Sequence, residues 1–154
     1  QKAGASAVII HGRTKEQGYS GSANLNIIKN IKEKLNIPVI VNGDIKDLQA
    51  FKNAKEMGFN SIMIGRGALG RPFIFREIKK NQNKLTKKNI KKAFKRHFKY
   101  LKSEYHEKYI VNSLKKHVAR YLTGLDNAST IKRKALRLDR SADIYKTVIK
   151  FLNN

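Results

Sequence analysis

Two stretches decide the fold of this chain: Ile37-Pro-Val-Ile-Val-Asn-Gly-Asp44 and Ser61-Ile-Met-Ile-Gly-Arg-Gly-Ala-Leu69. Each is a short apolar run, rich in β-branched residues, that stops at a polar turn containing glycine. A run that is apolar at every position, such as 38–41, is typical of a strand buried on both faces, as in a parallel sheet. The interval between them keeps apolar residues near helical spacing, and Gly58 is placed to end that helix. The pattern predicts a strand–helix–strand unit.

A third strand is expected earlier in the chain. Ala7-Val-Ile-Ile10 is apolar throughout and leads directly into His11-Gly-Arg-Thr14. An amphipathic helix is predicted between Leu25 and Leu35, before Pro38 opens the next strand. Three strands with two intervening helices favour a parallel sheet, whose strand ends share one edge. In α/β folds this carboxyl edge is where ligands bind.

Composition limits the classes of function. The chain has 154 residues, 40 % of them hydrophobic, which is enough for one domain or two small ones. It has no cysteine, so a disulfide, a thiolate metal site and a cysteine nucleophile are all excluded within this sequence. No apolar run approaches the roughly 20 residues that span a bilayer, so no membrane partner is expected. The opening residues lack a signal-peptide core and an initiator methionine, and we expect the chain to continue a longer one.

Positive charge is concentrated in the second half. Residues 1–80 hold 14 Lys and Arg against 6 Asp and Glu, whereas residues 81–154 hold 20 against 5. An excess of this size favours a polyanionic partner, because basic residues neutralise phosphates and release counterions. The alternative explanation for this charge is a general bias towards lysine, with the lysines simply placed on solvated helix faces.

The second half has the pattern of a small all-helical domain. Residues 79–84 form a polar stretch that we interpret as a linker, so the predicted domains are 1–78 and 79–154. Thr86 is a candidate N-cap for a first helix, and Gly124 is placed to stop a second. Ser141 is a candidate cap for a fourth helix. The apolar positions of the four helices are, in order, Ile90, Ala93, Phe94, Leu101 and Tyr105; Val111, Leu114, Val118 and Leu122; Ile131, Ala135 and Leu138; Ile144, Val148 and Leu152.

Three polar motifs follow the three predicted strands. Gly65-Arg66-Gly67 could cradle a phosphate, because glycines let the backbone approach closely and arginine adds a forked cation. Taken alone, it could equally be an ordinary turn. Asn42-Gly43-Asp44 could be an Asx turn, and His11 could be a structural residue. Because the three motifs must meet at one sheet edge, together they favour a cofactor that carries phosphate.

The same motifs resemble a known family. His11-Gly-Arg-Thr14 with Gln17, Tyr19, Ser20 and Gly21, then Pro38 to Ile45, then Met63 to Gly70 with Pro72-Phe-Ile-Phe75, resembles the tRNA-dihydrouridine synthases, and most of all their bacterial DusB branch. Lys116-His-Val-Ala-Arg-Tyr-Leu-Thr-Gly-Leu125 is similar to the RNA-binding helical domain of that branch. The likeness runs in the right order over nearly the whole chain.

The resemblance implies a flavin enzyme that acts on tRNA. It implies the last three β/α units of a TIM (β/α)₈ barrel that holds FMN, followed by a helical tRNA-binding domain. The family reduces uridine in tRNA to 5,6-dihydrouridine with NADPH as the reductant. The cofactor-binding residues that it implies here are His11, Asn42, Gly43, Asp44, Gly65 and Arg66. It also implies a cytoplasmic enzyme, and we expect a monomer.

The chain also departs from the family. Five of the eight barrel strands, together with the catalytic cysteine that protonates uracil, belong to an amino-terminal half that this sequence lacks. We therefore interpret it as a carboxyl-terminal fragment that is inactive by itself and contains no catalytic residue. One alternative is another FMN barrel, such as a relative of dihydroorotate dehydrogenase. Another is a non-catalytic RNA-binding protein that kept only the helical domain.

Several basic and aromatic residues are candidates for RNA contacts. The predicted phosphate contacts are Lys115, Lys116, Arg120, Lys132, Arg133, Lys134 and Arg137. Arg13 is a further RNA candidate, with a structural ion pair as its alternative. The tyrosines Tyr100, Tyr105, Tyr109 and Tyr121 could stack on bases or belong to the core. His97, His106 and His117 have no metal-ligand pattern, and we interpret them as structural or surface residues.

Overall fold

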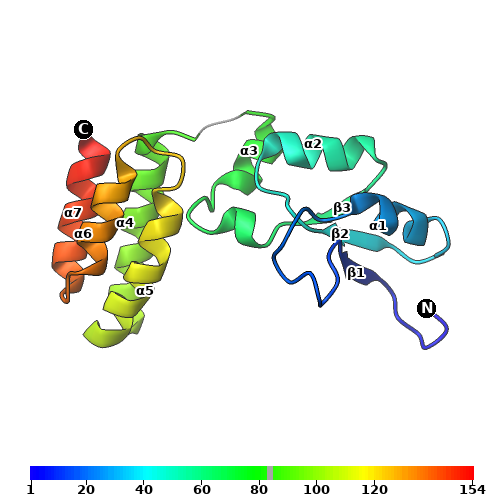
Figure 1. Cartoon of the computed structure of the whole chain (residues 1–154), viewed down its shortest axis with the longest axis horizontal. Helices are drawn as coiled ribbons and strands as arrows, with labels where there is room; N and C mark the ends of the chain where they lie inside the picture. The colour runs from blue at the N-terminus through cyan, green and yellow to red at the C-terminus, as the bar shows by residue number, and fades with distance from the viewer. Residues whose placement is uncertain (83–84) are drawn as a thin grey trace. The chain divides into compact units, whose positions relative to one another are not determined.

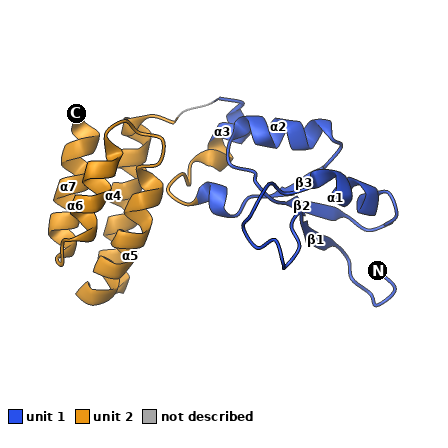
Figure 2. Ribbon diagram, viewed as in Figure 1, with its two compact units in different colours: residues 1–68, 77–82 blue, residues 69–76, 83–154 orange. Residues whose placement is uncertain are grey.

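A computed structural model describes residues 1–82 and 85–154 of the chain, which divides into two compact units. The first unit comprises residues 1–68 and 77–82, and the second comprises residues 69–76 and 83–154 (Figure 2). Each unit has its own hydrophobic core. The assignment of the two predicted domains to a flavin barrel and a tRNA-binding domain stays a prediction.

The first unit contains a three-stranded parallel sheet (Figure 1). Its strands are β1 (Val8–His11), β2 (Val39–Asn42) and β3 (Ser61–Met63), in that spatial order. The helix α1 (Leu25–Lys32) connects the first two strands, and α2 (Leu48–Glu56) connects the second and third. The predicted order of strands and helices is confirmed.

The register aligns the polar ends of the strands. His11 is paired with Asn42, and Asn42 is paired with Met63, so the last residues of all three strands lie at one level. Side chains on a strand alternate between the two faces of the sheet. These three residues therefore share one face and one edge.

Among the described residues, helices cover only one face of the sheet. Val39 and Val41 of β2 are buried in a core with Ile28 of α1 and Ala54 of α2. On the opposite face, Ile9 is 58 % exposed and Met63 is 44 % exposed. In this chain, the burial on both faces that the apolar runs favour is therefore reached on one face. A run that is apolar at every position shows that both faces of the strand suit burial. Whether each face is buried depends on other elements that pack against it.

Local signals fix the helix ends in the first unit. The side chain of Asn24 accepts a hydrogen bond from the Ile27 amide at the start of α1, and Asp47 does the same for the Ala50 amide at the start of α2. Such caps satisfy amides that have no partner within the helix. Gly58 follows α2 with φ of +88°, a conformation that glycine adopts without steric cost.

The second unit is a bundle of four helices: α4 (Lys87–Glu104), α5 (Glu107–Tyr121), α6 (Ala128–Leu136) and α7 (Ser141–Asn153). The helix α5 contacts each of the other three, and α7 also packs against α4 and α6. The fully buried side chains in their shared core are Ile90, Phe94, Leu114, Leu122, Ala135, Ile144 and Val148. Four helices were predicted, and Thr86 caps the first of them by accepting a hydrogen bond from the Asn89 amide.

Ser141 does not cap α7, contrary to the prediction. It is the first residue of the helix, and its hydroxyl donates a hydrogen bond to Oε2 of Glu107 at 2.8 Å. The Ser141 amide donates to Oε1 of the same carboxylate at 2.7 Å. A carboxylate from α5 therefore supplies the cap, because packing brings it closer to the free amide than any local side chain.

The segment between the two predicted domains differs as well. The helix α3 (Ile74–Lys80) continues into the stretch that we interpreted as a linker, and a 3₁₀ turn (Arg66–Ala68) precedes it. The last two residues of the predicted linker, 83 and 84, lie outside the described residues. Within the second unit, Gly70 packs so closely on the backbone of Arg120 and Tyr121 that a side chain there would collide with it.

Among residues 1–82 and 85–154, no helix combines the length and the apolar character needed to cross a membrane.

Candidate functional site

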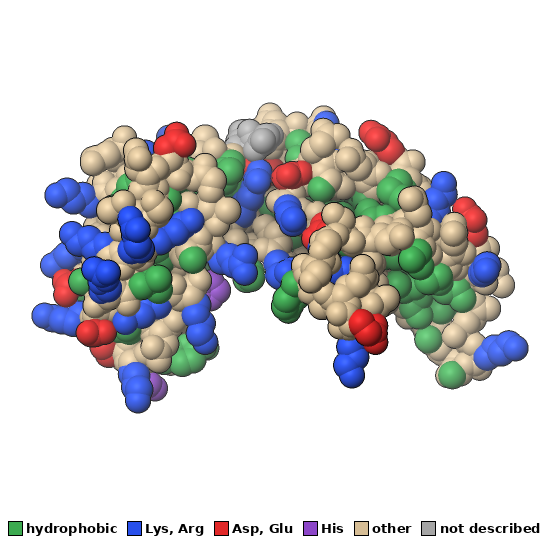
Figure 3. All heavy atoms as spheres, viewed as in Figure 1, with side chains coloured by type: hydrophobic (Ala, Val, Ile, Leu, Met, Phe, Trp, Pro, Cys, Tyr) green, Lys and Arg blue, Asp and Glu red, His purple; other side chains and the backbone are tan. Residues whose placement is uncertain are grey.

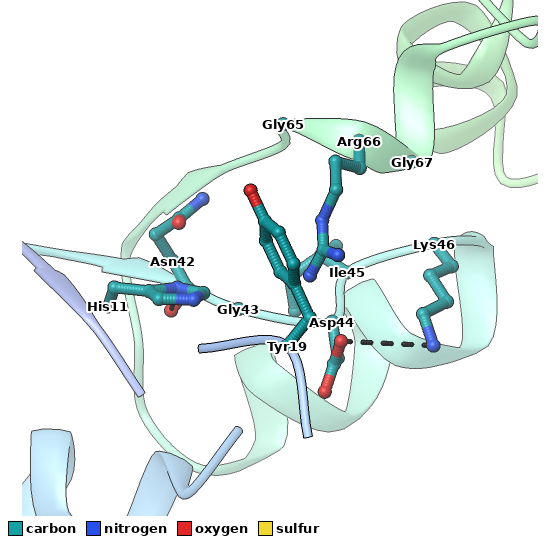
Figure 4. Close-up of a pocket in the computed structure, with 10 residues that line it drawn as sticks. All are labelled: His11, Tyr19, Asn42, Gly43, Asp44, Ile45, Lys46, Gly65, Arg66 and Gly67. Carbon is teal, nitrogen blue, oxygen red and sulfur yellow. Dashed lines mark hydrogen bonds and ion pairs between the residues drawn. The ribbon is translucent and has the colours of Figure 1, made fainter. Parts of the chain in front are cut away.

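A pocket of about 320 Å³ opens at the carboxyl edge of the sheet in the first unit (Figure 4). It brings together all six predicted cofactor residues, which are His11, Asn42, Gly43, Asp44, Gly65 and Arg66. Their shared edge follows from the register, because the three strands end at one level. The role of each as a cofactor contact stays a prediction.

Two side chains at the strand ends present hydrogen-bond acceptors to the pocket. The Nδ1 atom of His11 lies 3.1 Å from the carbonyl oxygen of Asn42, so it carries the proton in the neutral ring. The remaining nitrogen, Nε2, is then free to accept. The Asn42 amide nitrogen donates to the Met63 carbonyl at 3.0 Å, which leaves its Oδ1 atom as an acceptor. Acceptors of this kind suit the hydroxyl groups of a polyol.

Asp44 organises the wall of the pocket. It follows Gly43 in a left-handed turn, with φ of +50°. Its Oδ2 atom accepts hydrogen bonds from Arg13 at 2.7 Å and from the Ala23 amide at 2.8 Å. Burial alone would raise the pKa of Asp44, but the Ala23 amide, the Arg13 guanidinium and the nearby Lys46 outweigh it and lower the pKa below its usual value. Asp44 is therefore a firmly ionised carboxylate.

Arg13 is buried in this ion pair. Its side chain is 4 % exposed, and it also donates to the carbonyl oxygens of Ser20 and Gly21. The guanidinium thus fixes the loop after β1 against the turn after β2. This geometry favours the structural ion pair that we left open for Arg13 and disfavours its use as a surface contact for RNA.

The other end of the pocket is cationic. The Arg66 guanidinium lies 4.4 Å from the centre of the Tyr19 ring, which stands in the middle of the pocket (Figure 4). Lys46 also lines the pocket, and its Nζ atom is 3.8 Å from Oδ1 of Asp44. Arg66 and Lys46 are both cations, and the one nearby carboxylate, Asp44, is already paired with Arg13. This end of the pocket therefore has a net positive charge. A phosphate would be attracted here.

The two glycines of the loop after β3, Gly65 and Gly67, differ in whether the fold requires glycine at their positions. A Cβ atom at Gly67 would collide with the carbonyl oxygen of Ile45, so close packing of the two turns requires glycine there. A Cβ atom at Gly65 would meet nothing closer than the Asn42 amide at 4.0 Å, and its φ is not among the positive ones. The fold does not need glycine at 65. What its missing side chain provides is open space in the pocket.

The residues present fit a phosphorylated polyol. Acceptors from His11 and Asn42 match hydroxyl groups, and the Arg66 end matches a phosphate. The open position at Gly65 leaves room between them. The volume lies at the lower end of the range for small-molecule pockets.

Four residues that line the pocket were not among the six predicted cofactor residues: Tyr19, Ile45, Lys46 and Gly67. Of these, only Gly67 belonged to a motif that the sequence analysis proposed to bind phosphate. Tyr19 is part of a motif in the resemblance, but it lies eight residues beyond the end of β1 and no local pattern indicated its direction. The contacts of Arg13 with Ser20 and Gly21, which hold the loop that carries Tyr19, depend on tertiary structure.

Five of the predicted phosphate contacts are exposed on α5 and α6, two helices that pack against each other in the second unit. Lys116 and Arg120 are exposed on α5, and Arg133, Lys134 and Arg137 are exposed on α6 or at its end. We call these five residues the α5–α6 cluster. Two further predicted contacts are less available: Lys132 is half-buried, and Lys115 pairs with Asp139 at 3.1 Å. On the face of the helical unit that Figure 3 shows, Lys and Arg side chains are more prominent than Asp and Glu.

His97, His106 and His117, all in the second unit, make structural contacts. His97 and His117 pack edge to face between α4 and α5, with ring centres 4.8 Å apart. Burial lowers the pKa of both imidazoles, and burial raises the pKa of the adjacent Tyr121 to about 12. His106 caps α5 by accepting from the Tyr109 amide. Within the described residues, no group of three or more His, Asp or Glu could hold a metal ion.

Comparison with known proteins gives one consistent family. The sequence model of the family "Dihydrouridine synthase" matches residues 1–154. A probable tRNA-dihydrouridine synthase from Rickettsia bellii is 33 % identical over 97 % of this chain and 50 % of its own length. The tRNA-dihydrouridine(16) synthase of Escherichia coli O157:H7 is 33 % identical, over 96 % of this chain and 48 % of its own length. The tRNA-dihydrouridine synthase B of Vibrio parahaemolyticus is 37 % identical, over 84 % of this chain and 42 % of its own length. The chain spans about half the length of the curated relatives it matches, and the resemblance found in the motifs is confirmed.

Proposed function

The chain belongs to the dihydrouridine synthase family, and we propose that it supplies the carboxyl-terminal half of an enzyme that reduces uridine in tRNA. In this proposal the sheet is three strands of a TIM barrel, and its apolar uncovered face lines the barrel interior. The pocket at the strand ends binds FMN, and the helical unit binds tRNA. NADPH is the reductant. The catalytic cysteine belongs to the other half, so this chain alone is inactive.

The observation that carries the proposal is the division of the pocket into an acceptor end and a cationic end. His11 and Asn42 would accept hydrogen bonds from the ribityl hydroxyls, while Arg66, with Lys46 nearby, would hold the phosphate. Gly65 leaves the space that the cofactor needs, because only the Asn42 amide approaches its missing side chain. When bound, the flavin supplies the hydride for the reduction.

The other polar residues of the pocket keep its shape. Asp44 fixes the turn after β2 by accepting hydrogen bonds from Ala23 and Arg13. Through Arg13, the same carboxylate fixes the loop that carries Tyr19. The charge of Asp44 is compensated by Arg13 before any ligand arrives, so a phosphate can bind near it without strong repulsion.

The α5–α6 cluster is our candidate for the tRNA phosphate contacts. Its five cations are exposed, and they lie on two helices that pack against each other. A tRNA substrate leads us to propose a cytoplasmic enzyme, and we propose that it acts as a monomer.

The test of the cofactor site is the flavin content of the purified full-length protein. In the variant Arg66→Ala, removal of a charge-assisted hydrogen bond to the phosphate should weaken FMN binding about tenfold or more. Arg96→Ala is the matched control, because Arg96 also lies over a tyrosine ring, at 5.4 Å from Tyr100, but in the helical unit. Wild-type flavin content in Arg66→Ala would contradict the assignment.

The same preparation separates the alternatives. A protein that binds tRNA but retains no flavin would be a non-catalytic RNA-binding protein. One that holds FMN and oxidises dihydroorotate, without affinity for tRNA, would be a different flavin barrel. Retained FMN together with NADPH-dependent formation of dihydrouridine in an unmodified tRNA transcript supports our proposal.

A further inference from the structure

The turn between α4 and α5 carries two exposed aromatic rings that stack on each other. Tyr105 is the C-cap residue that directly follows α4, and Tyr109 lies in the first turn of α5. Their ring centres are 4.2 Å apart with an angle of 20° between the planes. The two residues are 48 % and 46 % exposed, respectively. We call this pair the tyrosine stack.

Packing within the unit does not account for the tyrosine stack. Tyr121 is 5 % exposed and belongs to the helical core, and Tyr145 stacks on Phe98 with centres 4.4 Å apart. Neither Tyr105 nor Tyr109 is among the buried residues of that core or the partly buried residues packed against it. The His106 ring lies against Tyr109 at an angle of 70°, with ring centres 6.5 Å apart. Because each tyrosine is still nearly half exposed, its uncovered surface can contact a third planar group.

The surroundings of the tyrosine stack favour an anionic ligand. Between residues 95 and 110 the sequence has five Lys or Arg and two Glu. One of the two, Glu107, already accepts both hydrogen bonds from Ser141. The hydrogen bonds from Ser141 lower the pKa of this carboxylate, and the positive charges of Arg140 and Lys102 lower it further. Cations therefore exceed carboxylates along the end of α4 and the turn that carries the two rings.

Planar aromatic faces combined with nearby cations are the features that bind unpaired nucleotides, through base stacking and phosphate contacts. We propose that the tyrosine stack is a binding site for one unpaired base of an RNA, with Lys102, Lys108 and Arg140 close to the adjacent phosphates. This inference rests on the proposed function only in taking RNA as the partner. The site lies in the helical unit and shares no residue with the pocket or the α5–α6 cluster.

The test measures binding of the full-length protein to an unmodified tRNA transcript and to a fully paired RNA duplex. The double variant Tyr105→Ala/Tyr109→Ala should bind the transcript about tenfold more weakly, because it can no longer stack on the base. Binding to the duplex should not change, because a duplex offers no free base. Leu136→Ala, which truncates an apolar side chain that is 50 % exposed on α6, is the control and should leave both affinities unchanged.

Salt dependence separates stacking from charge. The alanine double variant should keep the slope of log affinity against log salt concentration. Lys102→Gln/Lys108→Gln should instead reduce that slope by about 0.7 for each phosphate that the protein no longer neutralises. Tyr105→Phe/Tyr109→Phe keeps both rings and should bind as the wild type does.

A second variant keeps the test independent of folding losses. In the full-length protein, Tyr109→Trp places a fluorophore in the stack, and the fluorescence that it adds over the wild type should be quenched by the transcript but not by the duplex. Unchanged transcript binding by the alanine double variant, or equal losses for transcript and duplex, would overturn the inference and leave the proposed function intact. A wild-type protein that binds no tRNA would instead overturn the proposed function.

Discussion

Single residues in the loop after β3 have distinct physical constraints. Gly65 and Gly67 flank the same arginine, yet only a Cβ atom at 67 would meet backbone, at Ile45 and Lys46. Backbone atoms cannot move aside as the end of a flexible side chain can. The two glycines should therefore respond differently to the same substitution.

We expect Gly67→Ala to lower the free energy of unfolding by roughly 1–3 kcal/mol, because the added methyl group forces the two turns apart. Gly65→Ala should change it by less than about 0.5 kcal/mol. In the full-length protein, Gly65→Ala should nevertheless reduce flavin content, because the methyl group enters the pocket. Thermal unfolding and flavin absorbance measure the two effects. Equal stability of the two variants would contradict the packing argument.

A similar division of roles applies to Arg13 and Arg66. Both follow glycine-bearing strand ends, and both carry the same charge. Arg13 is 4 % exposed and bonded to both the turn and the loop, whereas Arg66 is exposed and faces the pocket. Residue type alone did not distinguish them, because the partners of Arg13 lie up to 31 positions away in the sequence.

At the scale of elements, the start of α7 depends on a carboxylate from α5. Glu107 accepts from the amide and the hydroxyl of Ser141. The Ser141 amide bond is the main cause of its lowered pKa, followed by the hydroxyl bond. A group whose pKa is lower in the folded state stabilises that state above its unfolded pKa. This stabilisation is lost as the pH falls through the folded pKa.

We therefore predict that Glu107→Gln unfolds at a lower temperature than the wild type at about pH 7, since an N-terminal cap is worth about 1 kcal/mol. The difference should shrink when the pH falls below the usual glutamate value of about 4.3. Circular dichroism at helical wavelengths follows the transition. Glu104→Gln is the control, because it removes a carboxylate at the end of α4 without touching the α7 cap. A difference in unfolding temperature that does not change with pH would contradict this prediction.

At the scale of the whole molecule, charge is the dominant feature. The net charge is +23, and most of it belongs to residues 81–154. The attraction between a protein of this charge and a nucleic acid is sensitive to salt, because each neutralised phosphate releases counterions. The structure adds that the basic residues are not equivalent, since some of them are already paired with carboxylates.

We predict that affinity for tRNA falls steeply with salt and that Arg133→Gln reduces the slope by about 0.7–0.9. Lys115→Gln should reduce it less, because Lys115 pairs with Asp139 and its side chain is only 24 % exposed. Filter binding across a salt series measures both slopes. Equal reductions of the slope in the two variants would show that Lys115 contacts RNA as readily as Arg133 does, despite its ion pair with Asp139.

Much of the architecture was predictable because its signals are local. Apolar runs form the three strands. Asn42 is the last residue of β2 and Arg66 lies shortly after β3, at the edge where a parallel sheet brings polar residues together. Thr86 and Gly58 mark helix ends through bonds and backbone angles a few residues away. These features depend on residues that are close in the sequence, so the sequence is sufficient to predict them.

Other features were decided only by the tertiary structure. Tyr105 and Tyr121 have the same side chain, yet one is exposed and the other belongs to the core. Glu107 caps a helix that starts 34 residues later, and β2 has one buried face where its apolar run fits two. In each case the outcome depends on which distant elements pack together. Burial and long-range hydrogen bonds are properties of that packing, and no local pattern contains them.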